Sequence, residues 1–382
     1  MIKNSEPKIA STSAASIVFF LSKGTFLGIG TYVIFKIAKT SAYISMILAF
    51  LIGIIPFAMN MYILKHTKGN NIIDTIDIAF GKKLGFIMNL IFSIFFFAFA
   101  TVLIYNFISF IDINYMPETS KLYIAVFMII ILAYMMSKGL NAIANASQMF
   151  LFVSIIILLL TIFGMISSID VNNLMPAFES PKLQILRGAT TAIGLSILPT
   201  FLINLIGTNI VDDKNKYIKS CYKMYGLVAL ELIVLFTLCL SALGINLISI
   251  NKYPEYLALT KVNILNLVKR VQNIIAVQLS YNVIILVVMS LMYPFKNIER
   301  YIKKEKKKPL VYFGISISSV VLSLYIFPNM TKANLFYIEY FPIVLGAFLG
   351  FFLLVIFFRI MYIEKKKKTL NNTFDSDSVE TR

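Results

Sequence analysis

Residues 14–35 read AASIVFFLSKGTFLGIGTYVIF, an apolar stretch that contains one lysine and three glycines. At about 20 apolar residues per crossing, this stretch is long enough to span a bilayer. Gly24, Gly28 and Gly30 each weaken a helix by roughly 1 kcal/mol relative to alanine. Opened backbone is tolerated inside a membrane only where protein or a cavity satisfies its polar groups. We therefore predict a membrane helix that is broken near these glycines.

Two interpretations of the glycines are open from the residues alone. Broken helices in transporters hold small-molecule sites near the bilayer midplane. There, free amides suit a carboxylate, and free carbonyls suit a cation. Alternatively, the glycines form a small-residue face on which a neighbouring helix packs.

The composition of the whole chain also indicates a membrane protein. Of its 382 residues, 59% are hydrophobic and 14% are charged, against roughly 25% charged in a typical soluble domain. A soluble fold of this size cannot hide so much apolar surface. The composition therefore excludes a soluble enzyme, a disordered chain and a disulfide scaffold. The fold class that it predicts is all-α, a polytopic membrane protein.

The residues that usually carry chemistry are scarce. Two distant cysteines, Cys221 and Cys239, and the single His66 argue against a disulfide, a zinc site and a Cys/His nucleophile. The chain has no P-loop, HExxH or GxSxG motif. We therefore expect no enzyme activity, no cofactor and no metal.

Apolar stretches of membrane-spanning length recur along the chain. We predict about ten transmembrane helices, near residues 14–35, 42–64, 85–110, 122–137, 146–168, 188–210, 224–248, 272–294, 310–327 and 340–362. Residues 1–368 form one transmembrane domain in this interpretation. Residues 369–382 form a polar cytoplasmic tail, which we expect to be disordered.

The distribution of positive charge predicts the orientation. The formal net charge is +17, and most of the Lys and Arg residues fall in loops on one side of the predicted spans. Because Lys and Arg concentrate in cytoplasmic loops, both termini are predicted to be cytoplasmic, which requires an even number of spans. The same residues suit contact with anionic lipid.

Two loops have helical periodicity. Residues 71–85 predict a helix at the inner membrane interface. Residues 253–272 alternate apolar and basic positions and predict an outer amphipathic helix. Ordinary surface helices are the alternative for both loops.

A second interruption is predicted in the sixth span. Pro199 removes one backbone hydrogen bond and blocks another. An interrupted helix five spans after the first is what a five-plus-five inverted repeat predicts, although this pairing rests on position alone. The small and polar residues of this span are Thr190, Thr191, Gly194, Ser196, Thr200 and Asn204.

Two ionisable residues stand out well inside predicted spans, where charges are costly and often functional. Lys23 accompanies the glycines of the first span, and Glu231 lies in the seventh. They could pair, or Lys23 could occupy a cation position. Alternatively, Lys23 reaches the interface along its aliphatic stem and Glu231 is partly exposed. Other polar residues in spans fix a ligand or join helices, and these are Tyr105, Asn106, Gln278, Ser280, Tyr281 and Asn282.

Several short motifs, in order, resemble those of a known family. They are FLGIG at 26–30, GKKLG at 81–85, DVNNLMP at 170–176, YP at 253–254 followed by VKRVQ at 268–272, and FP at 327–328. These motifs and the arrangement of about ten predicted spans resemble those of the spore germination permease family. This family comprises the B subunits of nutrient germinant receptors and belongs to the amino acid–polyamine–organocation superfamily.

The resemblance implies a LeuT-like fold with broken helices 1 and 6. It also implies a receptor in the spore inner membrane or cell membrane that binds a small nutrient, most simply an amino acid, and triggers germination. Its partners would be a germinant-receptor A subunit and a lipoprotein C subunit. The alternatives are an ion-coupled secondary amino-acid transporter and a membrane scaffold that has lost ligand binding. The broken helices, taken together with this fold, predict a ligand site. Its residues are Gly24, Thr25, Gly28, Gly30, Thr31, Tyr105, Ser196, Thr200 and Tyr281.

Overall fold

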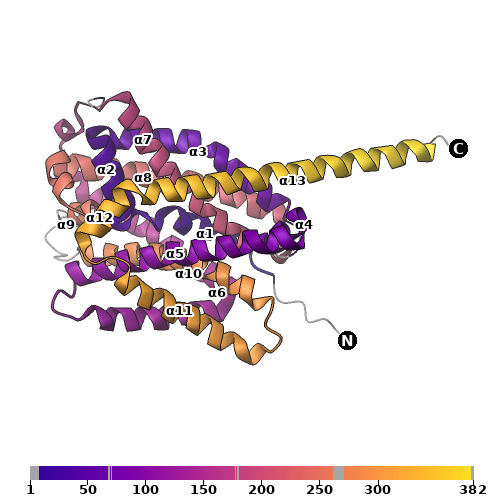
Figure 1. The fold of residues 1–382 in the computed structure, drawn as a ribbon. Coiled ribbons are helices and arrows are strands. Elements are labelled where there is room, and N and C mark those ends of the chain that lie inside the picture. Colours follow the sequence, from indigo (N-terminus) through magenta and orange to yellow (C-terminus); the bar gives the residue numbers. More distant parts are fainter. Residues whose placement is uncertain are drawn as a thin grey trace.

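The structure is a computed structural model that describes residues 8–379 except 68, 70, 177, 179 and 261–270. In this part of the chain the regular elements are helices, and one isolated bridge joins Ile9 to Val211. The all-α fold class is therefore confirmed. Figure 1 shows the helices as a bundle from which the C-terminal half of α13 projects.

The helices follow one another with short connections. They are α1 Ser11–Lys23, α2 Thr31–Ala38, α3 Ala42–Lys65, α4 Ile72–Phe80, α5 Lys82–Asn114, α6 Lys121–Met165, α7 Lys182–Ala192, α8 Lys214–Ile250, α9 Pro254–Thr260, α10 Val271–Glu299, α11 Lys308–Tyr325, α12 Met330–Glu339 and α13 Phe341–Val379.

Among the described residues, eight helical segments are long and apolar enough to cross a membrane. Two of them, Ser11–Lys65 with 55 residues and Lys121–Met165 with 45, have room for two crossings each at about 20 residues per crossing. The backbone turns inside both, at Lys39 (φ 47°) and at Gly139 (φ 74°). The structure thus supports a multi-pass membrane protein. The count of ten and the inverted repeat stay predictions.

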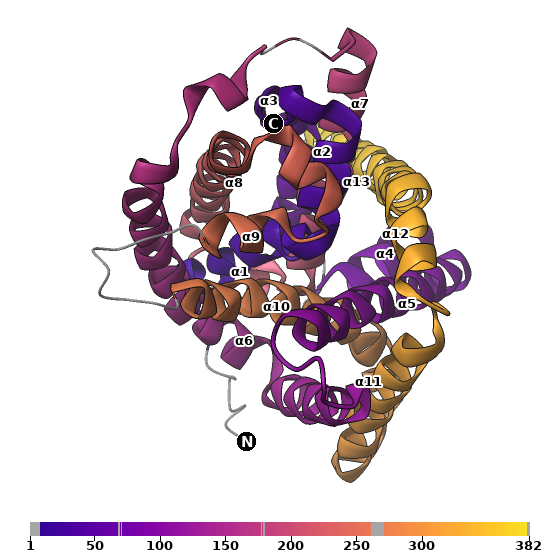
Figure 2. The ribbon, with the colours of Figure 1, turned by 90° about the vertical axis from the view of Figure 1, so that its left-hand side faces the viewer.

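Helix α1 is the centre of the bundle. All of its 13 residues except Thr12 are buried, and it packs against α6, α8 and α10. Figure 2 looks along the bundle and shows α9 crossing in front of α1 and α10. A helix surrounded in this way must satisfy its polar groups from neighbouring helices, which determines the chemistry of the site below.

The two short helices predicted in loops lie at opposite ends of the bundle. Helix α9 lies at one end with α12, and α4 lies at the other (Figure 1). The Asn71 side chain caps α4 by accepting hydrogen bonds from the amides of Ile73 (2.9 Å) and Asp74 (3.1 Å). Helix α4 ends at Phe80, and α5 begins at Lys82, so the predicted helix over 71–85 is two helices. Most of the predicted outer helix beyond α9 lies outside the described residues.

Two elements are longer than the predicted segments. The fourth and fifth predicted spans, 122–137 and 146–168, are two helices within α6 that meet at Gly139 (φ 74°, ψ −179°) without a loop between them. Helix α13 continues through Val379, and the disorder expected of residues 369–382 stays a prediction. A helix of 39 residues is about 58 Å long at 1.5 Å per residue. The division of the chain at residue 368 stays a prediction.

Candidate functional site

The break predicted in the first span is present between α1 and α2. We call residues Phe26–Gly30 the first break. Leu27 has an extended backbone (φ −62°, ψ 103°) and Gly28 a left-handed one (φ 64°, ψ 6°). Residues with a side chain rarely adopt this φ, and a Cβ at Gly28 would lie only 2.2 Å from Cε1 of Tyr253. Glycine is therefore required at this position by both conformation and space.

Side chains from two other helices satisfy the polar groups that the first break frees. The carbonyl of Leu27 accepts a hydrogen bond of 2.5 Å from Nδ2 of Asn106 on α5. The amide of Gly28 donates a hydrogen bond of 2.7 Å to Oε1 of Glu255 on α9. The opened carbonyl thus faces an amide donor, and the opened amide faces a carboxylate.

The two threonines of the predicted site hold the first break in place. The Thr25 hydroxyl donates to the carbonyl of Leu195 (2.7 Å) and so joins the first span to the sixth. The Thr31 hydroxyl donates to the carbonyl of Phe26 (2.5 Å) within the break. Gly24 packs closely on α10, because a Cβ there would lie 2.5 Å from Cβ of Leu286.

The sixth span changes its winding instead of opening. Helix α7 continues into a wide turn over Ile193–Ile197 and a tight helix over Leu198–Leu205, and its backbone stays helical until Ile206. Pro199 stands in the first turn of the tight helix, where its missing amide costs little. The prediction of a second broken helix therefore holds only as a change of helix type.

The predicted ligand residues of the sixth span have different surroundings. Ser196 is buried beside Leu195, and within the described part of the chain its Oγ has no hydrogen-bond partner. Thr200 accepts a hydrogen bond from Nδ2 of Asn60 on α3 (3.2 Å), and Asn204 donates to Oδ1 of Asn60 (2.6 Å). Ser196 is thus placed near the first break, whereas Thr200 serves the packing of α3.

The two predicted tyrosines contact aromatic rings outside the first break. Tyr105 packs edge-on against Phe327 with ring centroids 5.0 Å apart, and it lines a cavity of about 320 Å³ together with Asn329 and Lys121. Tyr281 stacks on Phe150 at 4.1 Å. Neither contact brings the tyrosine to the Gly28 amide, and a ligand role for them stays a prediction.

The two intramembrane charges form an ion pair. Nζ of Lys23 on α1 contacts Oε1 of Glu231 on α8, and the two side chains are only 5% and 7% exposed. Gln278 on α10 donates to the same oxygen at 3.3 Å. Lys23 Nζ also lies 4.5 Å from the centroid of the Phe19 ring. The pair therefore joins α1, α8 and α10, and the structure supports pairing over snorkelling.

Glu255 is the site residue that sequence reasoning missed. It is 1% exposed, although it lies in a seven-residue helix outside the predicted spans. Burial raises the pKa of Glu255 to about 7, and its hydrogen bond with the Gly28 amide and the charge of Lys252 oppose this rise. The only available signal was its place directly after the Tyr253–Pro254 motif.

Tyr253 completes a cover over the first break. Its ring is buried against Gly28 and packs edge-on against Phe110 with centroids 5.0 Å apart. Nζ of Lys252 lies 4.9 Å from the centroid of Tyr337 and 5.4 Å from that of Tyr253. Residues 252–255 thus bring an aromatic ring, a cation and a carboxylate to the break.

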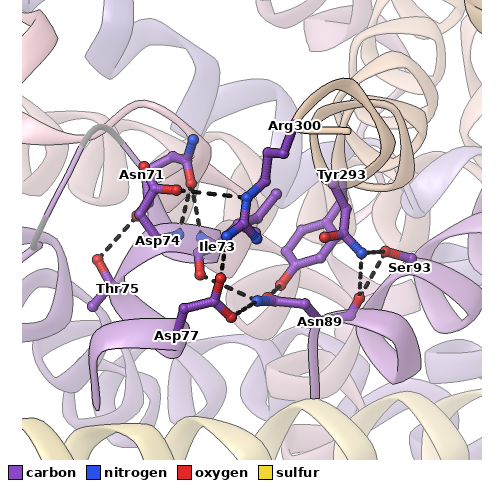
Figure 3. A network of polar contacts seen from close by, with 10 residues as sticks. Asn71, Ile73, Asp74, Thr75, Asp77, Asn89, Ser93, Tyr293 and Arg300 are labelled. Atoms are coloured by element: carbon purple, nitrogen blue, oxygen red, sulfur yellow. Dashed lines mark hydrogen bonds and ion pairs between the residues drawn. The ribbon is translucent and has the colours of Figure 1, made fainter. Parts of the chain in front are cut away.

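A polar network lies at the opposite end of the bundle, where α4, α5 and α10 meet (Figure 3). Arg300 forms an ion pair with Asp77, and its Nε lies 3.9 Å from Oδ1 of Asp74. Asn89 donates to Oδ1 of Asp77 (2.9 Å) and accepts a hydrogen bond from the Tyr293 hydroxyl (2.9 Å). The network therefore ties the short helix α4 to two spanning helices.

These features define a class of protein: a multi-pass helical membrane protein whose central helix is opened in the middle. A sequence profile described as "Spore germination protein" matches residues 13–331. The chain belongs to the spore germination protein family.

A curated relative agrees with this assignment. The chain is 27% identical over 244 residues to a Bacillus subtilis (strain 168) protein named "Putative spore germination protein YfkT". The match covers 63% of this chain and 65% of the relative. The chain thus spans just under two thirds of the length of the relative that it matches.

The ion pair yields the first prediction. Removing one partner of a buried pair leaves an uncompensated charge and typically costs 3–5 kcal/mol. We expect Lys23→Ala and Glu231→Ala each to lower the unfolding midpoint of the purified protein in detergent markedly. The double variant should lose less than the sum of the two. Additive losses in this double-mutant cycle would contradict an energetic coupling between Lys23 and Glu231.

The carboxyl group of Glu255 yields a prediction on pH. Its folded-state pKa of about 7 is above the ordinary value of 4.5, so its contribution to stability is complete below pH 4.5 and is lost as the pH rises through 7. We expect the unfolding midpoint of the wild-type protein to fall over this interval, and the fall to be smaller in Glu255→Gln. The charged or titratable groups that act on this carboxyl are Lys252, Tyr253 and Cys239. Equal pH profiles for the two proteins would contradict the assignment.

Proposed function

We propose that this chain is the membrane subunit of a spore nutrient-germinant receptor, which binds a small nutrient at the first break and triggers germination. Membership in the spore germination protein family supports a germination-related, permease-like membrane protein. The observation that carries the binding role is the opened backbone at Leu27 and Gly28, deep in a buried helix.

The chemistry of the first break favours an amino acid as the nutrient. A backbone amide that points away from its own helix binds a carboxylate well. The carbonyl of Leu27 suits an ammonium group. A ligand that carries both groups would therefore match the polar atoms of the break, while its side chain would meet the surrounding apolar residues.

The proposed mechanism is a shift between two conformations. A nutrient can shift such an equilibrium only by binding one state more tightly than the other. A germinant-receptor A subunit and a lipoprotein C subunit would transmit the change in the spore inner membrane. The proposed topology has both termini in the cytoplasm. The family is receptor-like or permease-like, and we propose no catalytic role.

An ion-coupled secondary amino-acid transporter is the second candidate. The buried Lys23–Glu231 pair favours it, because ionisable residues inside membrane spans commonly mark ion pathways. The two candidates differ in the steady uptake of solute that they predict. A transporter predicts saturable uptake driven by an ion gradient, whereas a receptor predicts a response without steady uptake.

The proposed function predicts the phenotype of an in-frame deletion in the spore-forming host. Spores that lack the gene should lose their germination response to one nutrient class while vegetative growth stays normal, because the receptor acts only in the spore. The measurement is germination against a panel of single amino acids and sugars. If every response survives and vegetative uptake of one solute falls, the transporter is the correct interpretation.

A variant of the first break tests the binding role. Gly28→Leu requires a positive φ that leucine rarely adopts and places a side chain onto the Tyr253 ring. We expect this variant to reach the membrane and to lose the nutrient response. Gly314→Leu is the matched control, because no atom lies within 4 Å of a Cβ there. A normal response in Gly28→Leu spores would contradict a binding site at the break.

A further inference from the structure

The Gly28 amide is already occupied by a carboxylate of the chain itself. Glu255 Oε1 lies 2.7 Å from this amide. The two atoms come from segments that are more than 200 residues apart. The freed donor of the first break is therefore satisfied by a residue from outside the spanning helices.

The position of Glu255 is poorly compensated. Among the described residues, no Lys or Arg nitrogen lies within 4.0 Å of its carboxylate. Its second oxygen, Oε2, is buried and, within the same part of the chain, has no hydrogen-bond partner. Buried carboxylates are costly unless paired and fully hydrogen-bonded. The Gly28 amide holds one carboxylate oxygen while the other lacks a partner, so the burial of Glu255 is only partly compensated.

The ring of Tyr253, two residues before Glu255, packs against the same glycine. It lies so close to Gly28 that a Cβ there would be 2.2 Å from Cε1 of Tyr253. Tyr253 and Glu255 lie on one short segment at the start of α9, which crosses the end of the bundle in front of α1 (Figure 2). A displacement of this segment would expose the amide and remove the ring in one movement.

We propose that Glu255 is an internal competitor for the ligand: it occupies a carboxylate site at the Gly28 amide, and a small carboxylate from outside takes its place and releases α9 from the first break. This inference rests on the proposed binding role of the break and adds the device that keeps the site closed. The ligand class is a small organic carboxylate, of which an amino acid is one case.

The tether determines how strongly Glu255 competes. A group attached to the same chain acts at an effective concentration of about millimolar or more. An external carboxylate must exceed this competition, so removal of Glu255 should increase the apparent affinity of the site. The nutrient sensitivity of spores should then increase with Glu255→Ala, because no tethered carboxylate competes for the Gly28 amide.

Chemical rescue tests the proposal on the purified full-length protein. Glu255→Ala should lower the unfolding midpoint in detergent, and sodium acetate should restore at least half of the loss relative to sodium chloride at equal ionic strength. Acetamide, which has the same shape without the charge, should restore less. The matched control is Glu118→Ala, since Glu118 is an exposed glutamate. Equal effects of acetate on both variants and the wild type, or no effect on Glu255→Ala, would overturn the proposal.

A second measurement covers the case in which Glu255→Ala does not fold. The chain contains no tryptophan, so Tyr253→Trp introduces a single fluorescent reporter into the otherwise unchanged protein. Acetate well above the effective concentration of the tether should shift its emission to longer wavelength as the ring leaves Gly28. Phe313→Trp, at an exposed position of α11, should not respond. An unshifted emission of Tyr253→Trp would overturn the proposal.

These measurements separate the inference from the proposed function. Rescue and fluorescence use purified protein and require no spores. Normal germination of a deletion strain would contradict the receptor role without contradicting the carboxylate site. If acetate does not rescue Glu255→Ala but the deletion strain loses a germination response, the receptor role is supported and the internal competitor is contradicted.

Discussion

Every polar backbone group inside the bundle needs a partner, and this constraint determines the construction of the first span. Inside a bilayer no water is available to satisfy an opened amide or carbonyl. The break at Leu27 and Gly28 creates one of each, and the structure supplies Asn106 for the carbonyl and Glu255 for the amide. The break therefore requires α5 on one side and α9 on the other.

Helix α10 connects the two ends of the molecule. Near its beginning it contacts α9 and supplies Gln278 to the buried ion pair. Near its end it supplies Tyr293, and Arg300 follows it directly, in the network that holds α4 (Figure 3). One helix thus takes part in the contacts at both ends of the bundle, with α9 at one end and with the network that holds α4 at the other.

Much of the fold could be predicted because its signals are local. Apolar stretches indicate spans, and the three glycines indicate the opening at Gly28. The partner of the Gly28 amide could not be predicted, because Glu255 is distant in sequence and lies in a short helix that periodicity assigns to the surface. Pro199 led to the prediction of an opened sixth span. A proline in the first turn of a helix is compatible with helical backbone, so no opening is needed there.

The two buried acidic groups near α1 have different energetics, and this difference indicates which of them moves. Glu231 is neutralised by Lys23 and hydrogen-bonded by Gln278, so separating this pair would strand two charges in an apolar interior. Glu255 accepts a hydrogen bond from the Gly28 amide, but among the described residues its Oε2 has no hydrogen-bond partner and its carboxylate has no ion pair. It is therefore the group whose release costs least. The ion pair is best understood as the fixed support of the broken helix, and the carboxylate of α9 as its removable part.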